Sequence, residues 1–181
     1  MMNIELESMA IEMPAVVGHP NREPFHGVLT LVDVASDKAP SGARGHRVVL
    51  TRGAAETALA SLLGMALDYS LSLDRHDTHR KVGVITRAEI VGRKLELGGY
   101  LFAKDFPDIV KQIGRGGDCQ RGMDAASSPC HACLAMSYEI ADARVADMSA
   151  KIWTLTHVTF TGAAILRRDK AAYRDTWIEL D

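Results

Sequence analysis

The sequence has little excess charge, no long apolar run and few cysteines. The formal net charge of the 181 residues is -2, which provides no overall attraction to nucleic acid or to an anionic membrane. No apolar run approaches the roughly 18 residues of a transmembrane helix, and the acidic opening MMNIELESMAIEM is unlike a signal peptide. We therefore expect a protein that stays in the cytoplasm where it is made, with neither nucleic acid nor membrane as a partner.

The three cysteines of the chain lie close together in the sequence. In a reducing compartment they are expected to be thiols or metal ligands and not disulfides. The C-x-x-C pair of Cys130 and Cys133 can direct two thiolates at one ion, and Cys119 and His131 would complete a tetrahedral structural zinc site. A second C-x-x-C pair is missing, so unpaired thiols in a loop are the alternative.

The length and composition indicate one folded domain. With 47% hydrophobic and 24% charged residues, the chain is typical of a globular protein, and it is too short for two comfortable domains. Residues 1–24 read as an N-terminal arm, because a polar loop follows a short apolar-acidic alternation. Residues 25–181 are expected to form the domain, with a Cys-rich loop at 114–133.

Periodicity and turn residues divide this domain into strands and two helices. An isolated helix between groups of strands does not fit a regular βαβ alternation, so an α+β or barrel-like architecture is favoured over a doubly wound sheet. We expect strands at residues 25–33, 46–51, 81–90, 92–102, 134–140 and 151–160, and helices at residues 53–67 and 106–114.

Ser137 lies at the centre of the apolar run LAMSYEI. A serine on a strand usually only hydrogen-bonds to neighbouring backbone. Serine attacks a carbonyl carbon only when a base activates its hydroxyl. A histidine base works best when a third group orients its ring. His76 and His157 could supply these two roles. His79 is the alternative base, and Asp77 is an alternative orienting acid, although neighbours on a strand point to opposite faces.

Three segments carry a resemblance to a known family. HDTHRKVG, LAMSYEI and TLTHVTFTGAA resemble segments of the tailed-phage prohead (capsid maturation) proteases, in the same order and with similar gaps between them. The resemblance covers most of the chain, from about residue 25 to 173, but only these three segments are specific. It implies the fold shared with herpesvirus assemblins, which is a barrel-like, mostly antiparallel β core with a few surrounding helices.

The resemblance also implies roles for individual residues. Ser137 would be the nucleophile, His76 the general base and His157 the residue that orients the base, with no cofactor required for catalysis. Many family members carry Glu at the position of His157. The catalytic residues of this chain would instead be Ser-His-His, and we expect a modest catalytic activity. Glu139 shares the strand face of Ser137 and could tune the site or bind a partner charge. Arg144 would take the part of an arginine that, in the herpesvirus relatives, follows the serine strand and helps to stabilise the oxyanion.

The function implied by the resemblance is that of a serine endopeptidase of prohead maturation. Its substrates would be phage scaffold and major capsid precursor proteins, cut within the assembling prohead in the host cytoplasm. Self-cleavage is a further expectation, and a homodimer is compatible with the family. The alternative is a non-catalytic protein of the same fold, a minor capsid or decoration protein that zinc could stabilise.

Overall fold

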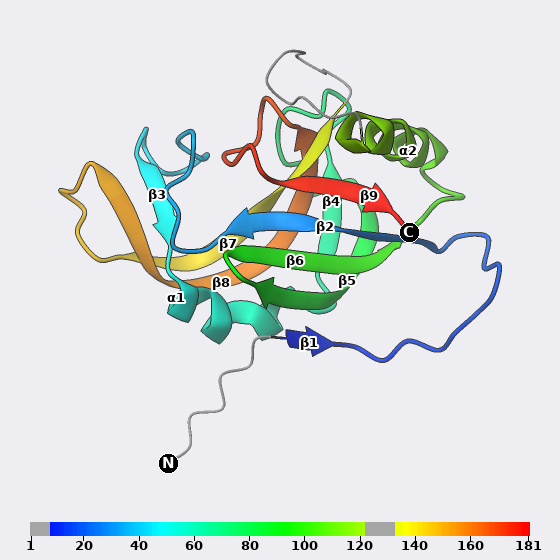
Figure 1. The fold of residues 1–181 in the computed structure, drawn as a ribbon, viewed down its shortest axis with the longest axis horizontal. Coiled ribbons are helices and arrows are strands. Elements are labelled where there is room, and N and C mark those ends of the chain that lie inside the picture. The colour runs from blue at the N-terminus through cyan, green and yellow to red at the C-terminus, as the bar shows by residue number, and fades with distance from the viewer. Residues whose placement is uncertain (1–7, 122–132) are drawn as a thin grey trace.

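The computed structural model describes the backbone of residues 8–121 and 133–181, and the side chains of this part except those of residues 116–121. Two helices and a short 3-10 helix accompany the strands (Figure 1). The helices are α1 (Arg52–Ala58), η1 (Leu59–Leu62) and α2 (Pro107–Arg121). The strands are β1 (Ser8–Ala10), β2 (Glu23–Leu31), β3 (Arg47–Leu50), β4 (Ala66–Tyr69), β5 (Lys81–Val91), β6 (Lys94–Leu101), β7 (Leu134–Val145), β8 (Ile152–Arg167) and β9 (Trp177–Leu180).

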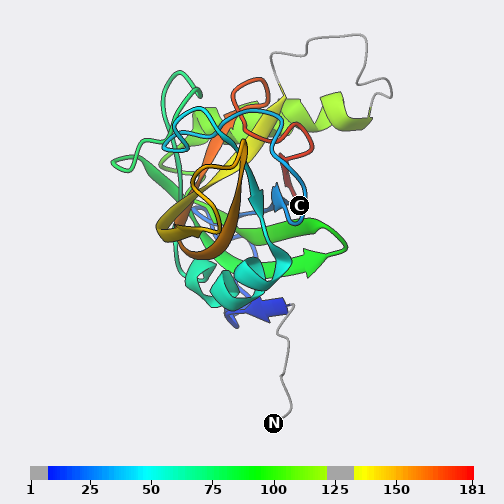
Figure 2. The ribbon, with the colours of Figure 1, turned by 90° about the vertical axis from the view of Figure 1, so that its left-hand side faces the viewer.

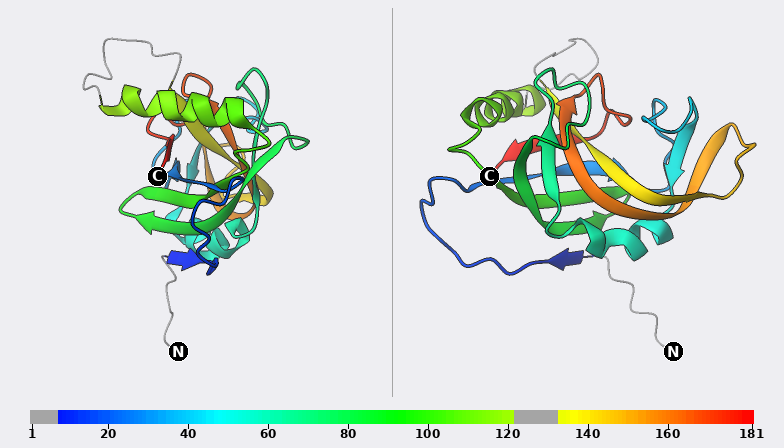
Figure 3. Two further views of the ribbon diagram at one scale, coloured as in Figure 1. Left: turned by 90° about the vertical axis from the view of Figure 1, so that its right-hand side faces the viewer. Right: turned by 180° about the vertical axis from the view of Figure 1, so that it is seen from behind.

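All described strands belong to one mixed sheet. Its order is β3-β8-β4-β5-β6-β2-β9, with β1 added to β5 and β7 added to β8. Only β3 and β4 run parallel to their partner β8, and the other described pairings are antiparallel. The long strands β7 and β8 bend strongly, so that the sheet curls into a half-barrel (Figures 2 and 3). The expected α+β fold with a barrel-like, mostly antiparallel β core is confirmed.

Buried apolar side chains from several strands form one hydrophobic core. Phe25, Leu97 and Phe160 come from β2, β6 and β8, and each is at most 1% exposed. Helix α1 begins behind Thr51, whose hydroxyl accepts a hydrogen bond from the Ala54 amide, and it buries its alanine side chains. Helix α2 packs near β9 and buries its apolar face (Figure 3). Helix α1 thus packs against β8, and α2 packs against β9.

The predicted helix over residues 53–67 was too long. Helix α1 and η1 end at Leu62, and Gly64 has a φ of 78°, a conformation that glycine adopts without steric cost and that ends the helical turn. The next residues form β4, which the sequence did not predict, because its four residues are too few for a periodicity. Strands β7 and β8 and helix α2 are in turn longer than expected. Within the described residues, no helix is long and apolar enough to cross a membrane.

Candidate active site

Strand β8 brings residues from two other strands to one place. Asp68 of β4 and Ser137 of β7 are both register partners of Ala164, on opposite sides of β8. Glu139 of β7 is the partner of Gly162. Residues directly opposite one another on neighbouring strands point to the same face of a sheet, and residues two apart on a strand share a face. Asp68, Ser137 and Glu139 therefore share one face of the sheet.

Gly162 leaves the space that the Glu139 side chain uses. A Cβ atom at this position would lie 2.9 Å from Glu139 Oε2 and 3.1 Å from the backbone oxygen of Ala66. Both distances are shorter than ordinary van der Waals contact. A side chain on residue 162 would therefore push the carboxylate away from its present position over β8.

The loop of residues 70–80, between β4 and β5, places His76 above this face. Ser70 and Ser72 donate hydrogen bonds to the Asp74 carboxylate, at 3.2 and 2.5 Å, and this turn precedes the histidine. After the histidine, the Asp77 amide donates a hydrogen bond of 3.0 Å to Asp68 Oδ1. A hydrogen-bonded turn thus precedes His76 in the loop, and a hydrogen bond to β4 follows it.

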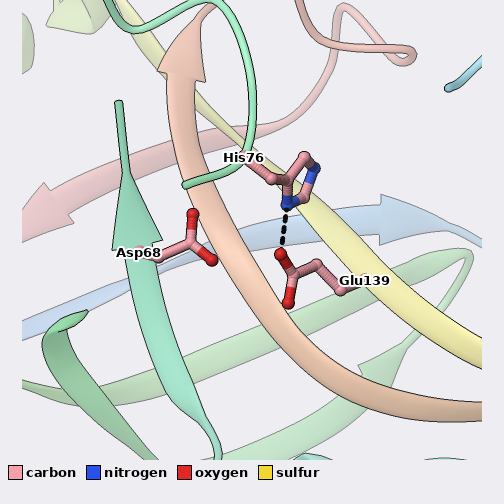
Figure 4. Close-up of side chains that lie close together, drawn as sticks. All are labelled: Asp68, His76 and Glu139. Atoms are coloured by element: carbon pink, nitrogen blue, oxygen red, sulfur yellow. Dashed lines mark hydrogen bonds and ion pairs between the residues drawn. The ribbon is translucent and has the colours of Figure 1, made fainter. Parts of the chain in front are cut away.

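The His76 ring is hydrogen-bonded to the Glu139 carboxylate. Its Nδ1 lies 3.0 Å from Glu139 Oε1, and the two side chains are 26% and 15% exposed. Figure 4 shows Asp68 on the other side of β8, with its carboxylate directed toward the same pair. Among the described residues, no hydrogen bond joins the Ser137 hydroxyl to an imidazole.

Asp68 is the most strongly perturbed acid of the site. Its side chain is fully buried, and burial, followed by the nearby Glu139 carboxylate, raises its pKa from the usual range to about 6. The hydrogen bond from the Asp77 amide and the proximity of His76 act in the opposite direction. The site therefore holds two carboxyl groups that resist being charged together.

A cavity of about 670 Å³ opens beside this cluster. Ser137, His76 and Glu139 all line it. Apolar side chains of the half-barrel line another part of its wall, and Arg75 and Lys170 contribute positive charge. A molecule bound in the cavity would therefore meet the hydroxyl, the imidazole and a mixed apolar and cationic surface.

The structure does not bring His157 to the other two predicted residues. His157 is the partner of Arg144, at the far end of the β7–β8 pair. His157 is seven positions along β8 from Ala164, the partner of Ser137, a separation of about 23 Å along a strand. Glu139 takes the ring contact that was expected of His157, and Arg144 is too distant to act beside Ser137.

The remaining predicted residues near His76 point elsewhere. Asp77 accepts a hydrogen bond from the His79 amide and forms an ion pair with Arg80. Both contacts of its carboxylate therefore lie within its own loop. His79 is exposed. Of the two histidines, His76 is therefore the better candidate base, because it contacts Glu139.

No protein-family model and no curated protein sequence matches this chain. The resemblance to prohead proteases consequently depends on the three sequence segments. Their residues His76 and Ser137 line one cavity, whereas the third segment contributes β8, which carries neither His76 nor Glu139.

The predicted zinc ligands fall mostly outside the described part of the chain. Cys130 and His131 lie between the two described ranges, and Cys119 lies in the part of α2 whose side chains are not described. Cys133 is a buried free thiol whose backbone oxygen accepts a hydrogen bond from the Arg168 amide. The structural zinc site stays a prediction.

Asp68 was missed from the sequence. It directly follows the segment that was predicted to be helical, so its place in a short buried strand was hidden. A charged residue between the apolar residues Leu67 and Tyr69 was the available signal, because a buried acid is rare without a partner. Glu139, in contrast, was correctly placed on the face of Ser137 by strand alternation.

Proposed function

We propose that this protein is a serine endopeptidase in which Ser137 is the nucleophile, His76 the general base and Glu139 the group that orients the imidazole. One observation carries the proposal: the hydrogen bond of 3.0 Å between His76 Nδ1 and Glu139 Oε1, in a cavity that Ser137 also lines. An acid that fixes the ring of a histidine beside a serine is the arrangement that activates a hydroxyl.

The spacing along β7 fits these roles. Ser137 and Glu139 are two residues apart on one strand, so their side chains start about 6.7 Å from each other. An imidazole that makes one hydrogen bond of about 2.8 Å with each nitrogen joins two oxygen atoms that lie a similar distance apart. With Nδ1–H donated to Glu139, the lone pair of Nε2 is free to accept the Ser137 proton.

The reaction would be acyl transfer in two halves. Ser137 Oγ attacks the peptide carbonyl carbon while its proton moves to His76 Nε2, and the same proton then passes to the leaving amine as the C–N bond breaks. Water repeats the sequence on the acyl-enzyme and restores the serine. The charge of Glu139 stabilises the imidazolium, and Arg75 offers a positive charge to the oxyanion.

A protein substrate suits the position of β7. In the described sheet, β7 pairs only with β8, and we propose that an extended peptide adds along its other edge as a further strand. The resemblance to prohead proteases points to phage scaffold and capsid precursor proteins as substrates, within the assembling prohead. It also implies self-cleavage, and it is compatible with a homodimer.

A fluorophosphonate probe tests the proposal, with the label located by mass spectrometry. We expect label on Ser137 in the wild-type chain and none on residue 137 in Ser137→Ala. In His76→Ala the label should be lost, because the hydroxyl then has no base. In Glu139→Gln it should form at least about 10-fold more slowly, because the side chain still accepts a hydrogen bond but has no charge.

His157→Gln separates the two candidate orienting residues. We expect this variant to be labelled at the wild-type rate, since His157 lies far from Ser137 along β8. Slow labelling in His157→Gln together with normal labelling in Glu139→Gln would contradict the proposed set.

The second candidate is a non-catalytic protein of the same fold. It is favoured by one observation, which is that the described residues include no hydrogen bond between Ser137 and His76, although such bonds are often loose without substrate. Absence of label in a wild-type sample whose circular dichroism shows a folded protein would favour this candidate over the peptidase.

A further inference from the structure

Three potential metal ligands converge beside β8. Asp68, His76 and Glu139 each offer one ligand atom, and these atoms all lie within 4.8 Å of one another. They come from β4, the loop of residues 70–80 and β7, and Figure 4 shows them directed toward a common point. Two carboxylate oxygens and one imidazole nitrogen form a donor set that divalent first-row metal ions accept.

The buried carboxyl group of Asp68 has one oxygen without a hydrogen-bond partner. The side chain is fully buried, and its Oδ2 has no hydrogen-bond partner. The Lys81 ammonium lies 3.7 Å from this oxygen, which is within reach of a charge interaction but beyond a hydrogen bond. A buried polar atom without a hydrogen-bond partner is costly and rare, so this oxygen, on a carboxyl group beside two other potential ligands, supports the presence of an ion.

Repulsion between the two carboxylates supports the same conclusion. The ligand oxygens of Asp68 and Glu139 lie within 4.8 Å of each other, a distance at which two negative charges repel. Neighbouring carboxylates are stable together when a proton or a cation lies between them. His76 contacts Glu139 and Lys81 contacts Asp68, and His76 and Glu139 also line the cavity.

We infer that Asp68, His76 and Glu139 form a binding site for a divalent metal ion, with the ligands Asp68 Oδ2, His76 Nδ1 and one Glu139 carboxylate oxygen. Bonds of about 2.0–2.2 Å to each ligand require the three atoms to draw closer. The partly exposed His76 and Glu139 side chains can make this adjustment, and the cavity gives water access to the remaining coordination positions.

Occupancy of this site would switch off the base, a consequence that rests on the proposed peptidase function. An ion on Nδ1 replaces the hydrogen bond to Glu139, and the neutral ring then carries its proton on Nε2. Nε2–H cannot accept the proton of Ser137. The metal-bound protein would therefore be an inactive form, and removal of the ion would restore the Glu139–His76 pair.

Manganese(II) binding to the full chain tests the site. Mn²⁺ suits carboxylate and imidazole ligands and has little preference for thiolates, so the cysteines do not compete. Titration followed by electron paramagnetic resonance of free Mn²⁺ should give one bound ion per chain. Saturating Mn²⁺ should also raise the Tm, because the ion binds only the folded form.

Variants identify the ligands. Asp68→Asn, His76→Gln and Glu139→Gln should each weaken Mn²⁺ binding at least 10-fold and remove the shift in Tm. Glu89→Gln, which removes a carboxylate on β5 that pairs with Arg87, should bind as the wild type does. If Asp68→Asn fails to fold, the two partly exposed ligands still decide the question. Failure of the wild type to bind one ion, or equal affinity in the ligand variants, would overturn the site.

Fluorophosphonate labelling with EDTA and with saturating Mn²⁺ separates this inference from the proposed function. Label on Ser137 in EDTA that bound Mn²⁺ suppresses supports both. Mn²⁺ binding without label in either condition supports the site and overturns the peptidase. Label that bound Mn²⁺ leaves unchanged overturns the inhibition.

Discussion

Asp68 shows how one buried acid shapes the behaviour of the site. Its carboxyl group has a pKa of about 6, raised mainly by burial and then by Glu139. A folded-state pKa above the unfolded one means that the folded protein holds the proton more tightly. This group therefore contributes most to stability below pH 4, and its contribution falls as the pH rises toward and through 6.

Asp68→Asn should remove this dependence on pH. The amide keeps an oxygen for the Asp77 N–H and carries no charge at any pH. Relative to the variant, the free energy of unfolding of the wild type should fall by an amount on the order of 2 kcal/mol between pH 4 and pH 8. Urea unfolding of both proteins in EDTA at several pH values measures it, and a constant difference across this range would contradict it.

At the scale of elements, β8 is the strand that lies between the two strands that carry Asp68 and Glu139. It pairs with β7 on one side and with β4 on the other. Gly162 is the position at which the strand leaves room for the Glu139 carboxylate between these neighbours. The contact between Glu139 and His76 therefore depends on the absence of a side chain on β8.

Gly162→Ala should disturb the site more than the fold. The added Cβ displaces Glu139 from His76, so labelling of Ser137 should slow as it does in Glu139→Gln. Its close approach to the backbone of Ala66 should cost about 1–3 kcal/mol of stability. Fluorophosphonate labelling and urea unfolding give the two values.

Gly53→Ala is the matched control for this substitution. Gly53 lies in α1, and a Cβ there would meet no atom within 4 Å. Alanine in the helix should raise the free energy of unfolding by about 0.5–1 kcal/mol and leave labelling unchanged. Normal labelling in Gly162→Ala would show that the glycine is not needed to place Glu139.

At the scale of the whole molecule, one sheet links the two ends of the fold. Trp153 lies on β8, next to the end strand β3, and Trp177 lies on the opposite end strand β9. The core between them is continuous, with buried residues from β2, β5, β6 and β8 in one cluster. A shared core of this kind favours unfolding as a single cooperative unit.

The two tryptophans of the chain report on this cooperativity. Trp177→Phe leaves Trp153 as the fluorescent probe, and Trp153→Phe leaves Trp177. In each variant, the urea transition seen by fluorescence should coincide with that seen by far-UV circular dichroism. Earlier loss of the Trp177 signal than of the circular dichroism would show that β9 and α2 separate from the rest of the sheet first.

The sequence by itself determined most elements and the class of the fold. Alternating apolar residues predicted strands at residues 81–90 and 92–102, which the structure shows as Lys81–Val91 and Lys94–Leu101. Gly92, with its positive φ, lies in the turn expected between them. These features depend on neighbours along the chain, through period and turn chemistry. The shared face of Ser137 and Glu139 was predictable for the same reason.

Only the tertiary structure decided which of these residues meet. The contact between His76 and Glu139 joins positions 63 residues apart, and it requires the register of β7 and β4 on β8. Register depends on which side chains the whole sheet can bury, and a single segment does not contain that information. For this reason His157 fell outside the cluster, and Asp68, at the end of a segment expected to be helical, became part of it.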